Sequence, residues 1–232
     1  MTGSSLPQLK VPLANRLRAR RARLVWWWST RKLPLIKRSL DIVLVLSALV
    51  MLAPLFLMVA LAIKLYDRGP VLFWQMRVGL HGEIFEFPKF RSMCVNAEAV
   101  RAALMANNQH GSEGVTFKMK RDPRITPIGR LIRRTSIDEL PQLWCVLTGQ
   151  MSLVGPRPPL VNEVARYTMQ ERQRLSVTPG LTCIWQVNGR SEIPFPQQVL
   201  MDIDYIRQRS IGTDVKLLAK TLPAVIRGRG AY

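Results

Sequence analysis

Residues 134–158 read RTSIDELPQLWCVLTGQMSLVGPRP and contain two adjacent carboxylates, Asp138 and Glu139. Arg133 lies just before this stretch, and Arg157 lies near its end, between two prolines. Acidic residues are scarce, because the chain has 15 Asp and Glu against 34 Lys and Arg. An acidic pair among arginines therefore needs a reason. Our interpretation is that Asp138 is a nucleophile toward phosphorus and that the arginines bind the phosphates it attacks.

The same stretch also fits a purely structural role. Ser136 and Glu139, three residues apart before an apolar run, have the pattern of a helix capping box, which would make both acids structural. With Ser136 as the cap, Pro141 falls at the fifth helical position; with Asp138 as the cap, it falls in the first turn, where no N–H is needed. In both frames the acids lie at a helix N-terminus, which keeps carboxylates ionised and favours phosphate. The catalytic and structural roles both stay open on the residues alone.

The composition limits the classes of protein. A net charge of +19 favours polyanionic partners, namely nucleic acid, anionic lipid or phosphorylated substrates. The three cysteines, Cys94, Cys145 and Cys183, are far apart and form no C-x-x-C, which argues against a disulfide framework or a zinc knuckle. With only two histidines, a histidine metal site or a Ser-His-Asp triad is not favoured. No P-loop, dinucleotide-binding or G-x-S-x-G motif occurs.

An uncharged run of 22 residues, 42–63, is long enough for a transmembrane helix. Pro54 interrupts it and removes a helix hydrogen bond, and basic residues flank both ends, so the positive-inside rule gives no direction. A helix broken at Pro54 has arms of about 18 and 14 Å, each shorter than the roughly 30 Å hydrocarbon core. The pattern favours a re-entrant hairpin, with a spanning helix and a buried core helix as alternatives.

The flanking segments predict a tail and a soluble part. Residues 1–41 carry ten Lys or Arg, and the tryptophans at 26–28 suit the headgroup layer of a bilayer. In the soluble part we expect strands at 71–75, 84–87 and near 181–187, a polar helix at 96–105, a loop at 107–114, a short amphipathic turn at 128–132, and amphipathic helices at 199–207 and 214–226.

These pieces together resemble the bacterial sugar transferases, the monotopic polyprenyl-phosphate phosphoglycosyl transferases. The resemblance runs from Lys37 to Tyr232. Its pieces, in order, are Lys37-Arg38-Ser39-Leu40-Asp41, Pro54 in the apolar run, Lys89-Phe90-Arg91-Ser92-Met93, Asp122-Pro123-Arg124, Thr135 to Leu143, Met151 to Pro158, the Pro179-Gly180 to Arg190 segment with Trp185-Gln186-Val187, and the end Arg227 to Tyr232.

The resemblance implies an α+β fold in a monotopic membrane protein, with a Pro-broken re-entrant helix and a small, mainly helical cytoplasmic catalytic domain with short strands. We expect a basic, Trp-containing tail over residues 1–36, the re-entrant membrane helix over 37–66 and the catalytic domain over 67–232. The implied location is the cytoplasmic face of the bacterial inner membrane.

The resemblance also implies a reaction, the transfer of a sugar-1-phosphate from a UDP-sugar to undecaprenyl phosphate through a phosphosugar–aspartyl intermediate, which initiates exopolysaccharide, capsule or O-antigen synthesis. Carried over, Asp138 is the nucleophile and a Mg²⁺ contact, with Glu139 as its partner. Lys37 and Arg38 bind the lipid phosphate, and Arg157 binds nucleotide or sugar phosphate. Further substrate-binding candidates are Lys89, Arg91, Arg133, Gln186 and Arg190, and the residues around Gln186 are similar to members that use glucose or galactose.

The expected partners are undecaprenyl phosphate, a UDP-sugar and membrane lipids, with a homodimer as a candidate assembly and no nucleic acid. The chain departs from the family pattern at Cys183, where Gly is usual, at Cys145, where Asn is usual, and at Gln150, where an acid is usual. A rival hypothesis is a membrane-tethered basic protein that binds nucleic acid or anionic lipid. The charge supports it, but outside residues 26–28 no aromatic residues interleave with the basic ones.

Overall fold

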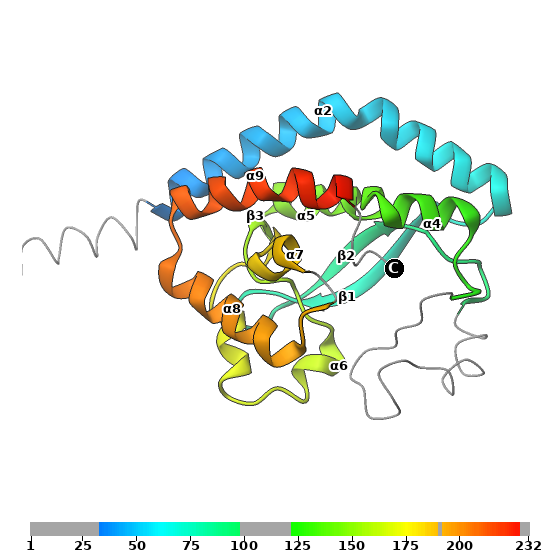
Figure 1. Ribbon diagram of the computed structural model, residues 1–232. Coiled ribbons are helices and arrows are strands. Elements are labelled where there is room, and N and C mark those ends of the chain that lie inside the picture. Colours follow the sequence, from blue (N-terminus) through cyan, green and yellow to red (C-terminus); the bar gives the residue numbers. More distant parts are fainter. Residues whose placement is uncertain (1–32, 98–121, 190–191, 228–232) are drawn as a thin grey trace, which may run out of the picture. The chain divides into compact units, whose positions relative to one another are not determined.

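The computed structural model describes residues 33–97, 122–189 and 192–227 (Figure 1). Its helices are α2 (Leu33–Asp67), α4 (Pro127–Arg134), α5 (Leu143–Thr148), α6 (Val161–Val164), α7 (Ile184–Asn188), α8 (Phe195–Gln208) and α9 (Ile211–Arg227). The 3₁₀ turns are η2 (Leu80–Gly82), η4 (Ile137–Gln142) and η5 (Glu171–Ser176), and the strands are β1 (Leu72–Val78), β2 (Ile84–Phe90), β3 (Ser152–Val154) and β4 (Gly180–Thr182). The chain divides into two compact units, Met1–Leu40 and Asp41–Tyr232. The site described below lies within the second unit.

Strands β1 and β2 form an antiparallel hairpin in which Leu72 pairs with Phe90 and Val78 pairs with Ile84. Side chains alternate between the two faces of such a ladder, so each face carries every second residue of both strands. On the face toward the core, Phe85 and Phe87 are buried, and Lys89 follows them on the same face. The hairpin therefore delivers a lysine to the edge of the core on a rigid support.

Strands β3 and β4 form a separate parallel pair, with Ser152 opposite Gly180 and Val154 opposite Thr182. The backbones come very close where Gly155, just after β3, meets Gly180, the first residue of β4. A Cβ atom built on Gly180 would lie 2.0 Å from the backbone nitrogen of Gly155, so glycine is required there. Because the strands run in the same direction, the segments that follow them start from the same edge of the pair.

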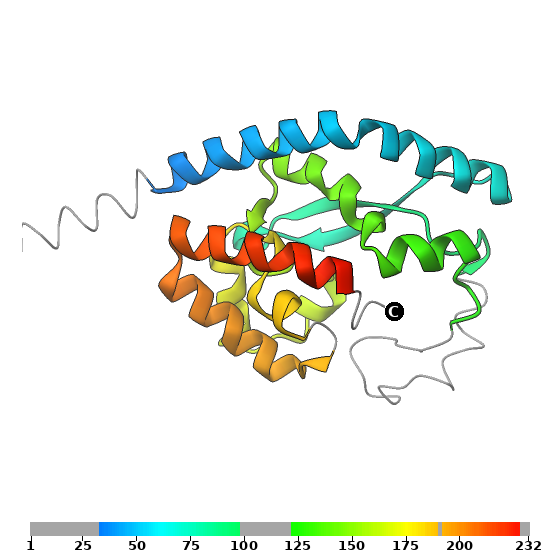
Figure 2. The ribbon, with the colours of Figure 1, turned by 45° about the horizontal axis from the view of Figure 1, so that its top comes forward.

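Helix α2 runs for 35 residues and contains Pro54 without a break in the helix (Figures 1 and 2). By length and composition, the part from Leu35 to Asp67 is apolar and long enough to cross a membrane, and among the described residues no other helix is. Much of its surface is exposed, with Val50 at 79% and Met51 at 77%. The predicted break into two arms at Pro54 is therefore not found, because the structure has one continuous helix.

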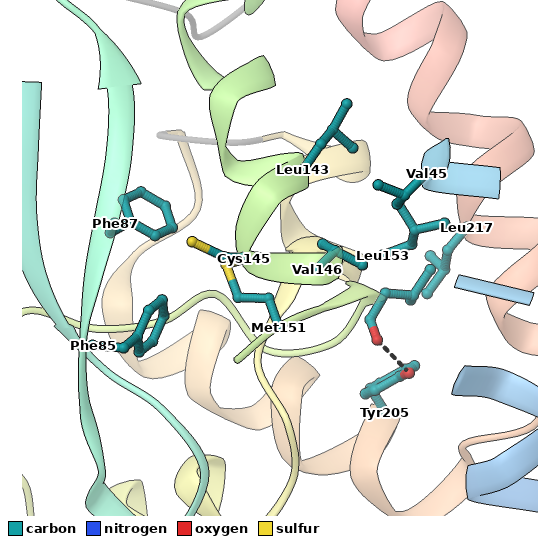
Figure 3. Packing of buried hydrophobic residues seen from close by; sticks show 11 residues of the cluster. Val45, Phe85, Phe87, Leu143, Cys145, Val146, Met151, Leu153, Tyr205 and Leu217 are labelled. Carbon is teal, nitrogen blue, oxygen red and sulfur yellow. Dashed lines mark hydrogen bonds between the residues drawn. The ribbon is translucent and has the colours of Figure 1, made fainter. Parts of the chain in front are cut away.

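The other side of α2 belongs to the protein core. Val45 packs in a buried cluster with residues of β2, α5, β3, α8 and α9. A second cluster joins Val59 and Ile63 to Phe90 and Ile132. Figure 3 shows the first cluster, in which Phe85 and Phe87 point toward Cys145 and Met151, and the Tyr205 hydroxyl donates to the Val154 carbonyl at 3.1 Å. One long helix therefore combines a lipid-compatible face with a packed face.

Most expected elements are confirmed. The mixture of helices and short strands, the hairpin, the short helix near residue 130 and the two C-terminal helices are present. The strand expected near 181–187 is wrong in its second half, because β4 ends at Thr182 and Ile184–Asn188 form helix α7, which lies between α8 and α9 (Figures 1 and 2). The expected elements at 96–105 and 107–114 lie largely outside the described residues, as does the tail. The boundaries 1–36, 37–66 and 67–232 stay predictions.

Candidate active site

The two carboxylates lie in η4, a 3₁₀ turn that links α4 to α5. Ser136 precedes the turn in a left-handed conformation (φ 56°), and its side chain makes no capping hydrogen bond. The capping box predicted from Ser136 and Glu139 is therefore not formed. Neither of the two α-helical frames considered for Pro141 is adopted, because Pro141 lies inside the 3₁₀ turn. The structure thus leaves the acids free of the capping role and held by tertiary contacts instead.

Glu139 is the anion at the centre of a cationic cluster. Arg157 Nη2 donates to Glu139 Oε1 at 2.6 Å and Nη1 donates to Oε2 at 3.4 Å. Lys89 Nζ donates to the same Oε1 at 3.1 Å. Burial alone would raise the pKa of Glu139, but Arg157 and Lys89 hold this pKa far below its usual value. Glu139 is therefore an ionised group whose two oxygens are occupied by cations.

Asp138 has a different environment from its neighbour. Only 7% of the residue is exposed. Burial raises the pKa of Asp138 above its usual value; Lys89 opposes this rise, and the charge of Glu139 adds to it. Arg133, half-buried in the last turn of α4, also favours the ionised form. Asp138 is thus a carboxylate short of positive charge, and a cationic ligand would favour its ionised state.

Arg77 belongs to the same cluster and was missed from the sequence. Its guanidinium lies over the Phe87 ring, 5.2 Å from the centroid, and Lys89 lies over the same ring at 5.6 Å. Arg77 Nη1 donates to the Pro158 carbonyl at 2.9 Å. Burial and the nearby Arg157 lower the pKa of Arg77 to about 10. Strand alternation alone could not identify Arg77, because the register that puts residues 75 and 77 on the face that carries Lys89 is known only from the structure.

The cluster carries more positive than negative charge. Three cations, Arg77, Lys89 and Arg157, lie near the two carboxylates; Glu139 is firmly ionised, and burial raises the pKa of Asp138 to about 6. Burial is the main cause of the lowered pKa of Arg77, and the like charge of Arg157 lowers this pKa further. An incoming anion would relieve this repulsion. Planar guanidinium groups bind phosphate with two parallel hydrogen bonds, so a phosphorylated ligand fits the site.

The other predicted site residues lie in several places. Arg91 is buried and pairs with Asp67 at the end of α2, rather than with the carboxylates. Gln186 lies on α7, and its Oε1 accepts a hydrogen bond from the Cys183 thiol. Lys37 and Arg38 lie in the first turns of α2, in the first unit. Arg190 lies outside the described residues.

The donor set suits a Mg²⁺ ion that is only partly bound by protein. Among residues 33–97, 122–189 and 192–227, no group of three or more His, Cys, Asp or Glu is placed to hold a metal. Glu139 is taken up by Lys89 and Arg157, so Asp138 is the carboxylate left to bind a cation. Mg²⁺ commonly uses one or two carboxylates and completes its shell with water and substrate phosphates. Asp138 together with a bound diphosphate meets that requirement.

The family model described as "Bacterial sugar transferase" matches residues 32–228. The chain is 50% identical over 166 residues to the "Galactosyl transferase CpsE" of Streptococcus agalactiae, covering 71% of this chain and 36% of that one. It is 40% identical over 206 residues to the "UDP-glucose:undecaprenyl-phosphate glucose-1-phosphate transferase" of Escherichia coli, covering 85% and 42%.

A third relative is close in length to this chain. The "Exopolysaccharide production protein ExoY" of Sinorhizobium fredii is 37% identical over 198 residues, which cover 84% of this chain and 88% of that protein. The chain thus spans about two fifths of the length of the Streptococcus and Escherichia proteins and most of the length of the Sinorhizobium protein. The match includes α2 and the whole cationic cluster.

Proposed function

The chain belongs to the bacterial sugar transferase family, and we propose on that premise that it transfers a sugar-1-phosphate from a UDP-sugar to undecaprenyl phosphate. The observation that carries the proposal is the buried Asp138 beside an excess of cations formed by Arg77, Lys89 and Arg157. That arrangement offers a nucleophile and a phosphate site in one place. The E. coli relative is named for this reaction with glucose.

We place the covalent step on Asp138. A carboxylate oxygen of Asp138 attacks the β-phosphorus of the UDP-sugar, the bond from that phosphorus to the bridging oxygen breaks, and UMP leaves with the bond's electron pair. The lipid phosphate oxygen then attacks the same phosphorus and releases the Asp138 carboxylate. No proton has to move in either displacement if both nucleophiles are ionised. The steps yield UMP and a lipid diphosphate sugar.

The surrounding residues prepare this exchange electrostatically. Glu139 orients Lys89 and Arg157 before the donor arrives, so little reorganisation is needed when the diphosphate binds. Arg133 favours the ionised form of Asp138. When bound by Asp138 and the donor phosphates, Mg²⁺ supplies further positive charge that reduces repulsion between the carboxylate and the diphosphate.

The acceptor is a membrane lipid, so we propose that α2 anchors the enzyme as a re-entrant helix at the cytoplasmic face of the inner membrane. At 1.5 Å per residue, 35 residues extend for about 52 Å, well beyond the roughly 30 Å hydrocarbon core. Pro54 lacks the N–H that would close the turn at mid-helix, and this weakens the helix where a re-entrant segment must bend. Lys37 and Arg38, at its start, are the proposed contacts for the lipid phosphate.

We propose glucose or galactose as the sugar and the first step of an exopolysaccharide as the pathway. The names of the Streptococcus and Escherichia relatives support the two sugars, and the name of the Sinorhizobium relative supports the product.

The test is UMP release in detergent with Mg²⁺, a panel of UDP-hexoses and undecaprenyl phosphate. We expect release with one or two donors, loss in chelator, and a fall of at least about a thousandfold in Asp138→Asn, which keeps the shape but removes the nucleophile. A phosphosugar bound to the protein should be trapped when the lipid is withheld. Release by Asp138→Asn at the wild-type rate would contradict the covalent route, and no release with any donor would contradict the function.

A further inference from the structure

The segment that follows β3 is hydrogen-bonded to both ends of β4. The backbone N–H of Gly155, after β3, donates to the Thr182 carbonyl at 3.0 Å, and the N–H of Gly180 donates to the Pro156 carbonyl at 2.8 Å. Arg157 is next in one segment, and Cys183 is next in the other. Helix α7 therefore begins at the same edge from which Arg157 reaches Glu139.

Cys183 is the residue before the first turn of α7 and is 2% exposed. Its thiol donates a hydrogen bond to Gln186 Oε1 at 3.1 Å. Burial and the charge of Asp202 raise the pKa of Cys183, while a hydrogen bond from the Gln186 backbone and then the charge of Arg157 act in the opposite direction. The thiol thus keeps its proton at neutral pH and lies within the electrostatic reach of Arg157. It is a hydrogen-bond donor at the start of α7.

This contact fixes the orientation of the Gln186 amide. Because Oε1 accepts from the thiol, the amide nitrogen and its two N–H groups are turned the other way. Helix α7 is held to α8 through Trp185, whose indole Nε1 donates to Asp202 Oδ2 at 3.4 Å. Arg174 Nε donates to the same Asp202 oxygen at 2.8 Å. Gln186 is half-buried, so the amide is sheltered but reachable.

We propose that Cys183 is a positioning residue for donor recognition: its thiol orients Gln186 so that the amide N–H groups bind a hydroxyl of the hexose whose phosphate Arg157 holds. The inference rests on the proposed function and adds the element that reads the sugar. A site that hydrogen-bonds a hydroxyl discriminates against a sugar that lacks it or turns it away, so the Cys183–Gln186 pair contributes to the choice among UDP-hexoses.

The first test is steady-state UMP release with UDP-glucose and UDP-galactose for Cys183→Ala and Cys183→Ser. Loss of one neutral hydrogen bond corresponds to about a three- to tenfold effect. We therefore expect Cys183→Ala to raise KM for the preferred donor about fivefold, with kcat within about twofold, and to reduce discrimination between the two donors by a similar factor. Cys183→Ser keeps a donor in the same place and should restore KM to within about twofold.

Cys145→Ala is the matched control, since Cys145 is also a buried thiol, 1% exposed, and donates to a backbone carbonyl, that of Glu86, at 3.4 Å. It should lower the melting temperature as much as Cys183→Ala does, without changing the ratio of kcat/KM between donors. A double-mutant cycle adds a second readout. If Cys183 acts through Gln186, Cys183→Ala should have little further effect on KM in a Gln186→Ala background.

Two results would overturn the inference while leaving the proposed function intact. One is an active wild type in which Cys183→Ala and Cys145→Ala have the same donor ratio, and the other is additive effects of Cys183→Ala and Gln186→Ala on KM. Absence of UMP release by the wild type with every donor would overturn both the inference and the function on which it rests.

Discussion

Glu139 is an ionised residue that touches two cations, and this sets its role apart from that of Asp138. Lys89 and Arg157 each donate to its carboxylate, and they also hold its pKa far below the usual value. A residue so fully engaged is poorly suited to accept or release a proton near neutral pH. The geometry favours Glu139 as the group that keeps the phosphate-binding side chains in place.

Glu139→Gln should therefore damage donor binding as well as turnover. The amide keeps the shape but cannot balance two buried cations, so we expect kcat/KM for the UDP-sugar to fall about ten- to a hundredfold. The measurement is the UMP-release assay with donor concentration varied. Glu86→Gln is the matched control, because Glu86 is exposed on the opposite face of β2. Equal kinetics for the two variants would contradict the assigned role.

Arg77 holds the loop that carries Arg157. Arg77 bonds the Pro158 carbonyl, and the N–H of its neighbour Val78 donates to the Pro159 carbonyl at 3.0 Å. Arg77 uses all three guanidinium nitrogens for its bonds to Gln75 and Pro158, and the single nitrogen of a lysine cannot reproduce that geometry, so Arg77→Lys should lower kcat/KM about tenfold. Hydrogen exchange at the Val78 amide should become faster. Arg207→Lys is the control, because Arg207 is exposed, and it should change neither the exchange rate nor the kinetics. The same result for Arg77→Lys would contradict the role assigned to Arg77.

At this scale the sequence identified the acidic pair and the residues that contact it but not Arg77. The structure brings three of the candidate site residues, Lys89, Glu139 and Arg157, into contact, while their roles stay predictions. Arg77 looks like an ordinary polar position of a strand until the hairpin register is known. Arg91 shows the converse, because its place in a motif gives no hint that Asp67 of α2 is its partner.

Among the elements, α2 is the one proposed to enter the bilayer. Re-entry puts both ends of α2 on one side, so single cysteines introduced at Ser39 and Tyr66, both exposed, should react with a membrane-impermeant maleimide from the cytoplasmic side only. The native cysteines of the protein are first changed to Ser. The labelling of each single cysteine is then compared between inverted and right-side-out vesicles. Reaction of the two positions from opposite sides would show a spanning helix and contradict the re-entrant proposal.

The sequence predicted helices and strands correctly where the hydrophobic periodicity was strong. The prediction failed where tertiary contacts determine the secondary structure. The apolar run and the C-terminal amphipathic patterns predicted helices that the structure confirms. Trp185, Gln186 and Val187 have a composition typical of strands, yet they form α7, because β4 is only three residues long and α7 is held by α8 and α9. The η4 turn likewise depends on contacts with β2 that no local pattern reveals.

In the second unit, the part of α2 from Asp41 onward has one buried side and one exposed side. Val45 is fully buried in the main core, whereas Val50 is 79% exposed. In detergent, Val45→Ala should lower the free energy of unfolding by about 2 kcal/mol, since it leaves a cavity. Val50→Ala should change it by less than about 0.5 kcal/mol. Thermal unfolding of both variants is the measurement, and equal shifts would mean that α2 is not coupled to the core.

The close backbone contact between Gly155 and Gly180 couples the segment that carries Arg157 to β4, the strand that leads into α7. A chimera that received only residues 183–189 from a relative with another sugar would place that helix on a foreign strand end. A Cβ added to either glycine would collide with the backbone of the other segment, so the two backbones must keep their present spacing. A chimera with a new sugar preference should therefore receive β3 and β4 together with the segments that follow them. In related proteins, we expect these four segments to change together.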